Sequence, residues 1–268
     1  MEKIIYLTGA SGQVGKNIRE KISSTKLHTV VYSRNELQLY KNEEFRQYDL
    51  GDEIIPKKGN YEHYIFHFAH DFNDKNNKED NINIIGLKKI ISSFKNIKKK
   101  KIIFISTPDV DNENKTVYTT QKCISESILD QERDLIIRSS LIFSKHGINK
   151  IFTYLARFPV PIPKNDGKIA PISINVFSNK LIEIALDDKT NGLYLFAGRE
   201  FMTLKEFLFR YHKVRTFFLP NFIWLIFSRI LKRINLSKCF YLSERILGFV
   251  YLRDLNELTA GNIKKITL

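Results

Sequence analysis

The chain alternates between short apolar runs and stretches in which apolar residues recur every three or four positions. Its first apolar run covers residues 4–7 and is followed, after a cluster of glycines, by helical spacing over residues 14–22. Continuous apolar runs are typical of strands buried on both faces, and helical spacing is typical of helices with one face against a core. This alternation predicts an α/β domain. Further predicted strands are 28–33, 45–48, 64–68, 102–105, 135–140 and 192–197, and further predicted helices are 80–94, 118–130, 149–157, 176–186 and 217–231.

The glycines between the first predicted strand and helix have a specific spacing. Gly9, Gly12 and Gly15 stand three positions apart, directly after the strand and at the start of the helix. In that order, they permit a tight turn, a close approach of the backbone to a pyrophosphate, and close packing of the helix on the sheet. The amides at the helix N-terminus then face the anion. A glycine turn without a ligand is the alternative, but the strand and helix around it favour a phosphate cradle.

The pattern Thr-Gly-x-x-Gly-x-x-Gly at residues 8–15 resembles the short-chain dehydrogenase/reductase superfamily, in particular its extended and atypical branches. The resemblance implies a doubly wound parallel Rossmann sheet that binds NADP or NAD. It also implies a dinucleotide-binding core at residues 1–145, completed by about 175–200. Residues 146–174 and 201–268 would then supply a small substrate lobe, built from interleaved segments, and the C-terminal helices.

The end of the second predicted strand is where dinucleotide-binding proteins choose their cofactor. An acidic residue there would bind both ribose hydroxyls of NAD, but this chain has Ser33 and Arg34. An arginine can pair with a 2′-phosphate, which favours NADP, although Arg34 could equally be a solvated loop charge. The resemblance implies further cofactor contacts at the glycine turn and at other strand ends. These are Ser11, Gln13, Val14, Asp49, Leu50, Phe68, Ala69, His70 and Asn83.

A tyrosine and a lysine open the helix that follows the fifth predicted strand. Tyr118 and Lys122 share a helix face, because they are four positions apart. A phenol has a pKa of about 10, but a nearby ammonium favours the phenolate and lowers that pKa. Ser106 and Thr107 end the preceding strand, where an open α/β sheet has its ligand crevice. We therefore expect Tyr118 to exchange a proton with a substrate oxygen that Ser106 or Thr107 orients, while Lys122 also holds the cofactor ribose.

The resemblance covers roughly residues 1–212 and implies an NAD(P)-dependent epimerase, reductase or dehydratase that acts on a nucleotide-linked sugar. Arg138 stands where the family has an arginine, and it either meets a diphosphate or serves in a structural ion pair. The chain departs from the nucleotide-sugar epimerases in the short connection, residues 108–117, that precedes Tyr118. Atypical relatives with short connections include non-catalytic binding proteins. An NADP-binding sensor or assembly subunit without turnover is therefore the alternative.

The charge and the cysteines limit the classes of partner and site. The chain has 43 Lys and Arg against 29 Asp and Glu, a net charge of +14 that attracts anions. The lysine run at 98–101 follows a predicted helix and favours a solvated face over a nucleic-acid site. Cys123 and Cys239 lack metal or disulfide spacing, and His67 and His70 lack partner carboxylates at ligand spacing. We therefore expect no metal, no nucleic acid and a reducing cytoplasm, since no secretory pattern is evident.

The C-terminal third has an unusually apolar segment. Thr203 and Glu206 first form a capping box that predicts a helix start, and residues 217–233 then combine dense aromatic and aliphatic residues with terminal cations. The apolar run is too short to span a bilayer. Three interpretations stay open, namely a helix packed on its own domain, a contact in a homodimer, and an interfacial helix of a membrane-surface protein of glycan assembly.

Overall fold

The computed structural model describes residues 1–74, 76, 78–112, 115–144, 159–164, 167–233 and 263–268. The chain divides into two compact units, each assembled from separated stretches. Unit 1 takes its residues from 1–106, 124–138 and 174–194, and unit 2 takes them from 107–123, 139–173 and 195–268. The predicted helix at 149–157 lies outside the described residues.

Unit 1 is built on parallel strands. From β1, the ladder runs one way through β2 to β3, and the other way through β4 and β5 to β6, with every pair parallel. The whole sheet has eight strands in the order β14-β11-β6-β5-β4-β1-β2-β3. The order reverses between β1 and β4, the point of such a sheet at which ligands bind beyond the strand carboxyl ends. The strands are β1 (Glu2–Thr8), β2 (His28–Ser33), β3 (Glu43–Gln47), β4 (Tyr61–His67), β5 (Lys100–Ser106), β6 (Leu135–Ser139), β11 (Gly192–Ala197) and β14 (Lys264–Thr267).

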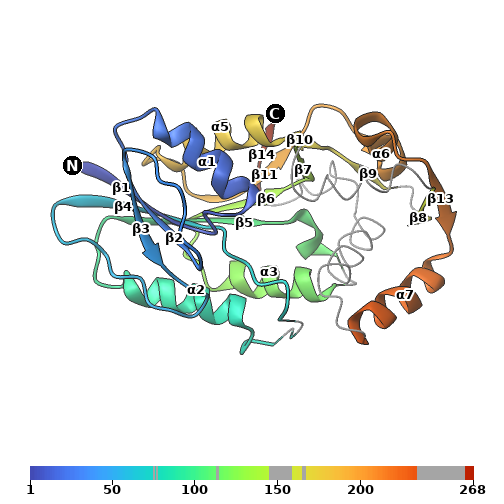
Figure 1. Cartoon of the computed structure of the whole chain (residues 1–268), viewed down its shortest axis with the longest axis horizontal. Coiled ribbons are helices and arrows are strands. Elements are labelled where there is room, and N and C mark those ends of the chain that lie inside the picture. Colours follow the sequence, from blue (N-terminus) through green and yellow to red (C-terminus); the bar gives the residue numbers. More distant parts are fainter. Residues whose placement is uncertain (75, 77, 113–114, 145–158, 165–166, 234–262) are drawn as a thin grey trace. The chain divides into compact units, whose positions relative to one another are not determined.

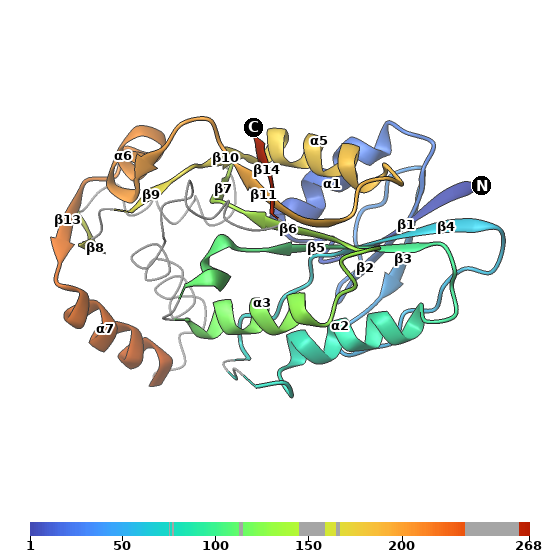
Figure 2. The same ribbon diagram turned by 180° about the vertical axis from the view of Figure 1, so that it is seen from behind.

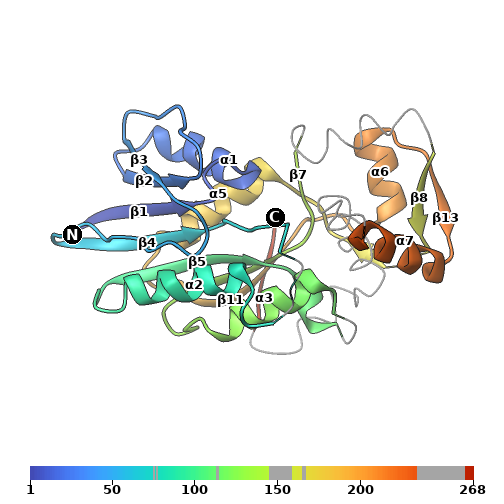
Figure 3. The same ribbon diagram turned by 60° about the horizontal axis from the view of Figure 1, so that its bottom comes forward.

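Helices cover both faces of the unit 1 sheet. α1 (Gln13–Ser23) and α5 (Ile174–Ala185) lie on one face, and α2 (Ile82–Ser93) lies on the other with the C-terminal part of α3 (Val117–Ser127) (Figures 1 and 3). The side-chain amides of Asn17 and Asn175 join α1 to α5 at 2.9 Å. The doubly wound parallel sheet is therefore confirmed.

The core beneath α2 explains why apolar runs form these strands. Ile4, Ile65 and Ile102 come from three adjacent strands and are buried in one cluster with Leu87 and Ile90 of α2. Branched side chains fill the pleated surface of a strand, and burial of each contributes roughly 1.5–3 kcal/mol. The apolar side chains on one face of the strands thus pack against the apolar side chains of α2 in a single core.

Unit 2 is made of short strand pairs and helices around a second core. Ile162, Ile169, Phe207 and Trp224 are buried together in it. β8 and β13 pair in parallel, β7 pairs in parallel with β10, and β9 pairs antiparallel with β12. The elements are η1 (Pro108–Asp111), β7 (Ile142–Phe143), β8 (Val160–Pro163), β9 (Lys168–Ile169), β10 (Ile172–Ser173), β12 (Met202–Thr203), α6 (Leu204–His212), β13 (Thr216–Leu219) and α7 (Asn221–Arg233).

The capping box at the start of α6 is confirmed. The hydroxyl of Thr203 accepts a hydrogen bond from the Glu206 amide at 3.2 Å, and the Glu206 carboxylate accepts one from the Thr203 amide at 2.7 Å. Each group satisfies an amide that the first turn of a helix would otherwise leave unpaired. The pattern thus fixes the start of α6 locally.

The apolar segment at 217–231 is not one helix, which corrects the sequence-based expectation. Its first residues belong to β13, and the helix begins only at Asn221, after Pro220 (Figure 2). The consecutive aromatic residues Phe217 and Phe218 suit a strand, and proline favours extended backbone in the residue before it. Among the described helices, none combines the length and apolarity that crossing a bilayer requires.

Candidate functional site

The turn between β1 and α1 is closed to side chains at two of its glycines. Gly9 has a φ of +72°, and a Cβ atom there would lie 2.6 Å from the carbonyl carbon of Phe68. A Cβ atom on Gly15 would lie 2.3 Å from the carbonyl oxygen of Gly9. The Gly12 amide donates to that same oxygen at 2.9 Å. The backbone itself therefore shapes the turn, as the approach of a phosphate requires.

The N-terminus of α1 presents backbone amides rather than side chains. Gly12 is the capping residue, no side chain of the described residues caps the helix, and its first turn has no acidic residue. Ser11 and Gly12 are exposed, whereas Gln13 and Val14 are half-buried. The first amides of a helix and its dipole attract anions, so this end can accept a phosphate without repulsion from a carboxylate.

The ends of β2 and β3 lie side by side in the sheet. Ser33 is buried and its carbonyl oxygen accepts a hydrogen bond from the Tyr48 amide at 3.0 Å. Arg34, one residue on, is exposed. The exposed carboxylate of Asp49 accepts from the amide of the adjacent Leu50 at 2.9 Å. An exposed guanidinium and an exposed carboxylate thus follow neighbouring strands.

Two buried tyrosines beneath this strand end were not predicted as site residues. The rings of Tyr32 and Tyr48 meet edge to face, with centroids 5.6 Å apart. Burial raises the pKa of Tyr32 to about 12 and also raises the pKa of Tyr48. Both phenols therefore stay neutral at physiological pH. The aromatic residues could be read from the sequence, but their contact depends on the register of β2 against β3.

The residues after β4 are held by side chains from other strands and helices. Ala69, which follows Phe68, donates its amide to the hydroxyl of Thr8 at 3.3 Å, and that hydroxyl lies 2.8 Å from Nδ1 of His67. Thr8 and His67 are both buried. His67 is thus a structural partner of Thr8, a role that the place of Thr8 in the glycine pattern did not indicate. His70 packs edge to face on Phe72 at 5.0 Å.

Asn83 of α2 anchors the loop that continues from β4. Its side-chain oxygen accepts a hydrogen bond from the Asp71 amide at 2.6 Å, and its side-chain nitrogen donates to the Asp71 carbonyl oxygen at 3.1 Å. One buried amide therefore satisfies both backbone groups of a loop residue. Across the described residues, no group of three His, Cys, Asp or Glu side chains could hold a metal ion.

Ser106 and Thr107 follow one another at the end of β5 but have different surroundings. The hydroxyl of Ser106 is buried without a hydrogen-bond partner among the described residues. Thr107 is also buried, and its hydroxyl caps η1 by accepting from the Asp109 amide at 3.5 Å. A buried hydroxyl without a partner costs roughly 1–3 kcal/mol, so Ser106 is a place at which stability is lower than it could be.

The tyrosine and lysine on α3 lie on one face of the helix, as their spacing predicts. Nζ of Lys122 is 5.7 Å from the centroid of the Tyr118 ring. Lys122 is buried, with 9% of its surface exposed, and Tyr118 is half-buried. A cation within about 6 Å of an aromatic ring centroid is attracted to the face of the ring. The prediction that the two side chains share a helix face agrees with this contact.

Arg138 in β6 forms an ion pair with Glu126 of α3. Nη2 of Arg138 is 2.7 Å from the Glu126 carboxylate, and the two side chains are only 11% and 9% exposed. Nε of Arg138 donates to the same carboxylate. Of the two roles considered for Arg138, this geometry favours the structural one.

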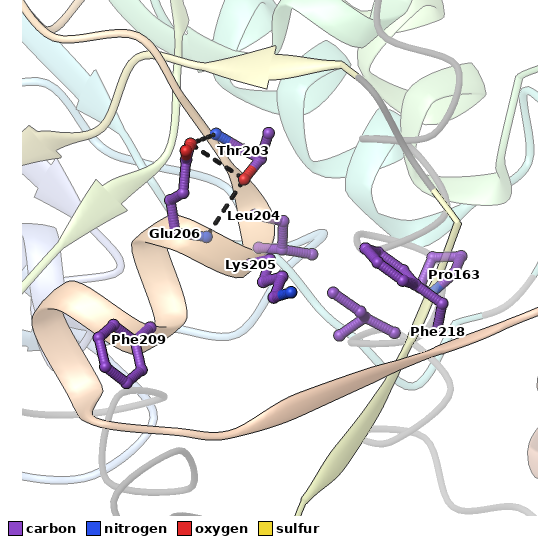
Figure 4. Close-up of a pocket in the computed structure, with 8 residues that line it drawn as sticks. Pro163, Thr203, Leu204, Lys205, Glu206, Phe209 and Phe218 are labelled. Carbon is purple, nitrogen blue, oxygen red and sulfur yellow. Dashed lines mark hydrogen bonds between the residues drawn. The ribbon is translucent and has the colours of Figure 1, made fainter.

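Unit 2 contains a cavity of about 350 Å³ that the sequence did not reveal. The start of α6 lines one side, and Pro163 and Phe218 lie on another (Figure 4). Lys205 approaches the Phe218 ring, with Nζ 5.5 Å from its centroid. Because its walls come from β8, β13 and α6, the cavity depends on contacts between segments about 50 residues apart in sequence. It is lined by Ile162, Pro163, Thr203, Leu204, Lys205, Glu206, Phe209 and Phe218.

No family model and no curated protein sequence matches the chain. Its fold is similar to that of solved nucleotide-sugar enzymes. The dTDP-glucose 4,6-dehydratase of Bacillus anthracis, solved with NAD, is 14% identical with a TM-score of 0.63 over 82% of this chain and 85% of that one. The UDP-glucose 4-epimerase of Thermotoga maritima, solved with UDP-glucose, is 17% identical with a TM-score of 0.62 over 81% and 85%.

A third similar structure is the UDP-N-acetylglucosamine 4-epimerase of Methanobrevibacter ruminantium in complex with UDP-N-acetylmuramic acid. It is 18% identical with a TM-score of 0.63, over 82% of this chain and 86% of that one. These likenesses show a shared Rossmann-type α/β fold. They confirm the fold that the resemblance in the glycine pattern implies.

Proposed function

We propose that the protein is an NAD(P)-dependent enzyme that converts one nucleotide-linked sugar into another, as an epimerase, reductase or dehydratase. The observation that carries the proposal is the pair on α3, in which the buried ammonium of Lys122 lies beside the ring of Tyr118. A phenol supported by a cation is suited to moving a proton between a hydroxyl and a carbonyl. The uncapped glycine turn before α1 supports dinucleotide binding in the same chain.

The chain's own residues suit a dinucleotide in a defined orientation. The amides that follow Gly12 would receive the pyrophosphate, and Asp49 would contact the adenosine. The exposed Arg34 supports NADP over NAD, because a guanidinium can pair with a 2′-phosphate. Lys122 would bind the nicotinamide ribose. When bound, the nicotinamide ring supplies a hydride acceptor or donor.

Proton transfer falls to Tyr118 in this proposal. Its phenol oxygen takes a proton from a sugar hydroxyl, or returns one to a carbonyl, while Lys122 stabilises the phenolate. Ser106 or Thr107 positions the reacting sugar oxygen by a hydrogen bond. The buried hydroxyl of Ser106, which has no partner among the described residues, supports Ser106, whereas Thr107 already caps η1.

The substrate class rests on the fold and on the charge. Two of the similar structures were solved with UDP-linked sugars. A net charge of +14 favours an anionic substrate such as a nucleoside diphosphate. We therefore propose a sugar joined to UDP or dTDP. Arg138 is a weaker candidate for contact with the diphosphate, because Glu126 already balances its charge.

Substitution of Tyr118 tests the enzymatic proposal. We expect Tyr118→Phe to lower kcat on the order of 10²-fold or more with UDP- or dTDP-sugars, because the variant keeps the ring but lacks the proton. The dissociation constant for NADP should stay within about twofold, because the phenol oxygen adds little to cofactor binding. Turnover is followed by chromatography of the sugar nucleotides, and cofactor binding by nicotinamide fluorescence. Full turnover in the variant would contradict the role of Tyr118.

The short connection over residues 108–117 favours a second candidate, an NADP-binding sensor without turnover. In that case the unmodified protein would bind NADP and convert none of the sugars in the panel. Ser106→Ala and Thr107→Val then separate the two hydroxyls in an active protein. We expect Ser106→Ala to lower kcat more than Thr107→Val does, and the opposite order would assign the positioning role to Thr107.

A further inference from the structure

Helix α7 exposes an apolar surface that is unusual for a protein surface. Phe222 is 63% exposed, Ile226 is 51% exposed and Ile230 is 49% exposed, and these residues follow one another at helical spacing. Phe227 is 45% exposed. Single exposed apolar residues are ordinary, but a continuous row of them marks a surface that binds something.

The opposite side of the helix holds α7 to unit 2. Trp224 is only 4% exposed and belongs to the second core, together with Phe207 of α6 and Ile162 of β8. The exposed apolar row is therefore the outer face of a helix whose inner face packs on the core of unit 2. β13, which precedes the helix, adds Phe218, which is 50% exposed (Figure 2).

The charges that this part of the sequence carries have one sign, and one of them, Arg210, forms an ion pair with Glu200 outside it. Residues 207–233 contain six Lys or Arg and no Asp or Glu. Arg229 and Arg233 are exposed on α7 itself, and Lys213 and Arg215 are exposed just before β13. An apolar row with exposed cations before and within its helix is complementary to the boundary between the acyl chains and the head groups of an anionic bilayer.

We propose that α7 and β13, residues 216–233, bind the surface of an anionic phospholipid membrane. The apolar row enters the head-group boundary and the four exposed cations contact acidic lipids. With 13 residues and a rise of about 1.5 Å each, α7 is roughly 20 Å long, so it lies in the interface rather than across the bilayer. The proposal is independent of the reaction that the protein performs.

The same charges argue against a symmetric dimer through this surface. In a two-fold interface, each copy presents the same patch to the other, so the cations of both copies would meet without any carboxylate between 207 and 233. Like charges brought together cost several kcal/mol. Lipid phosphates, in contrast, supply the opposite charge along the whole helix.

Vesicle binding of the full chain tests the proposal. We expect the protein to sediment with vesicles of phosphatidylcholine and phosphatidylglycerol, and to remain in solution with phosphatidylcholine alone. Phe222→Ser/Ile226→Ser should weaken binding roughly tenfold or more, through loss of inserted apolar surface. Arg229→Gln/Arg233→Gln should weaken it on the order of tenfold, through loss of two cations.

Matched controls distinguish binding through α7 and β13 from the general attraction of a basic protein to acidic lipids. Leu39→Ser/Ile55→Ser removes two exposed apolar residues, 42% and 72% exposed, from unit 1 and should leave binding unchanged. Trp224 is the single tryptophan of the chain, so its emission reports whether each variant keeps α7 packed. A variant with native emission and lost binding supports the proposal.

Three outcomes would overturn it. The first is an absence of binding to the acidic vesicles. The second is equal binding by the α7 variants and the unit 1 control, which would reduce the effect to net charge. The third is a dimer in native mass spectrometry that Phe222→Ser/Ile226→Ser dissociates, which would make this surface an interface between two copies.

Discussion

Gly9 must be a glycine for two reasons, its backbone conformation and the lack of space for a side chain. Its φ of +72° disfavours a side chain, and a Cβ atom would meet backbone atoms of Phe68 that cannot move aside. We expect Gly9→Ala to lower the free energy of unfolding by about 2 kcal/mol or more. It should also abolish NADP binding, because the turn must deform. Urea denaturation measures the first effect and nicotinamide fluorescence the second.

Gly51 provides a matched control for Gly9. Its φ is +96°, but the nearest atom to an added Cβ is the end of the Ile82 side chain, at 3.1 Å. Gly51→Ala should therefore cost about 1 kcal/mol, for the backbone conformation alone. NADP binding should be retained. Equal losses in the two variants would show that the contact with Phe68 is unimportant.

For single residues, the sequence predicts those roles that depend only on neighbours along the chain. The glycines were predictable because no other residue type fits their turn, and Lys122 beside Tyr118 followed from a spacing of four. The hydrogen bond between Thr8 and His67 was not predictable. It joins residues 59 positions apart, and it exists because β1 and β4 pair in one particular register.

The ion pair between Arg138 and Glu126 joins β6 to α3. Both side chains are nearly buried, so removal of either leaves an unbalanced charge. We expect Arg138→Met to lower the free energy of unfolding by about 3 kcal/mol. Arg138→Met/Glu126→Leu should recover part of that loss. Urea denaturation of the two single variants and the double variant gives the coupling, and purely additive losses would contradict the pairing.

Elements were predictable where the apolar pattern was strong. The strand at 28–33 was predicted with its observed bounds, whereas the one predicted at 45–48 is β3 at Glu43–Gln47, because its pattern is mixed. The tail after residue 254 offered no signal. β14 within it is polar and largely exposed, and it is held by its place beside β11. The resemblance of residues 243–248 to nucleotide-sugar reductases and epimerases lies outside the described residues.

Across the whole molecule, two histidines link stability to pH, namely the buried His63 and the half-buried His212. Burial lowers the pKa of His63 in unit 1 and of His212 in unit 2. Below the unfolded value of about 6.5, the unfolded chain binds protons that the native chain does not. Stability is therefore greatest above that pH and falls as the pH drops. We expect the free energy of unfolding to decrease between about pH 7 and pH 5.

Substitution of each histidine separates the two contributions. His63 lies 3.1 Å from the Tyr6 hydroxyl, so His63→Gln keeps a hydrogen-bonding side chain that does not titrate. The slope of stability against pH should flatten in His63→Gln, and flatten further when His212→Gln is added. The measurement is urea denaturation at several pH values. An unchanged slope in the double variant would assign the pH dependence to other groups.

The division into two units limits how the chain can be divided into fragments. The chain crosses from one unit to the other five times, after residues 106, 123, 138, 173 and 194. Neither unit corresponds to a contiguous stretch of the chain, so a fragment long enough to contain one complete unit also contains segments of the other. Nicking the backbone at a crossing should leave the two fragments associated, because at least one unit draws segments from both of them.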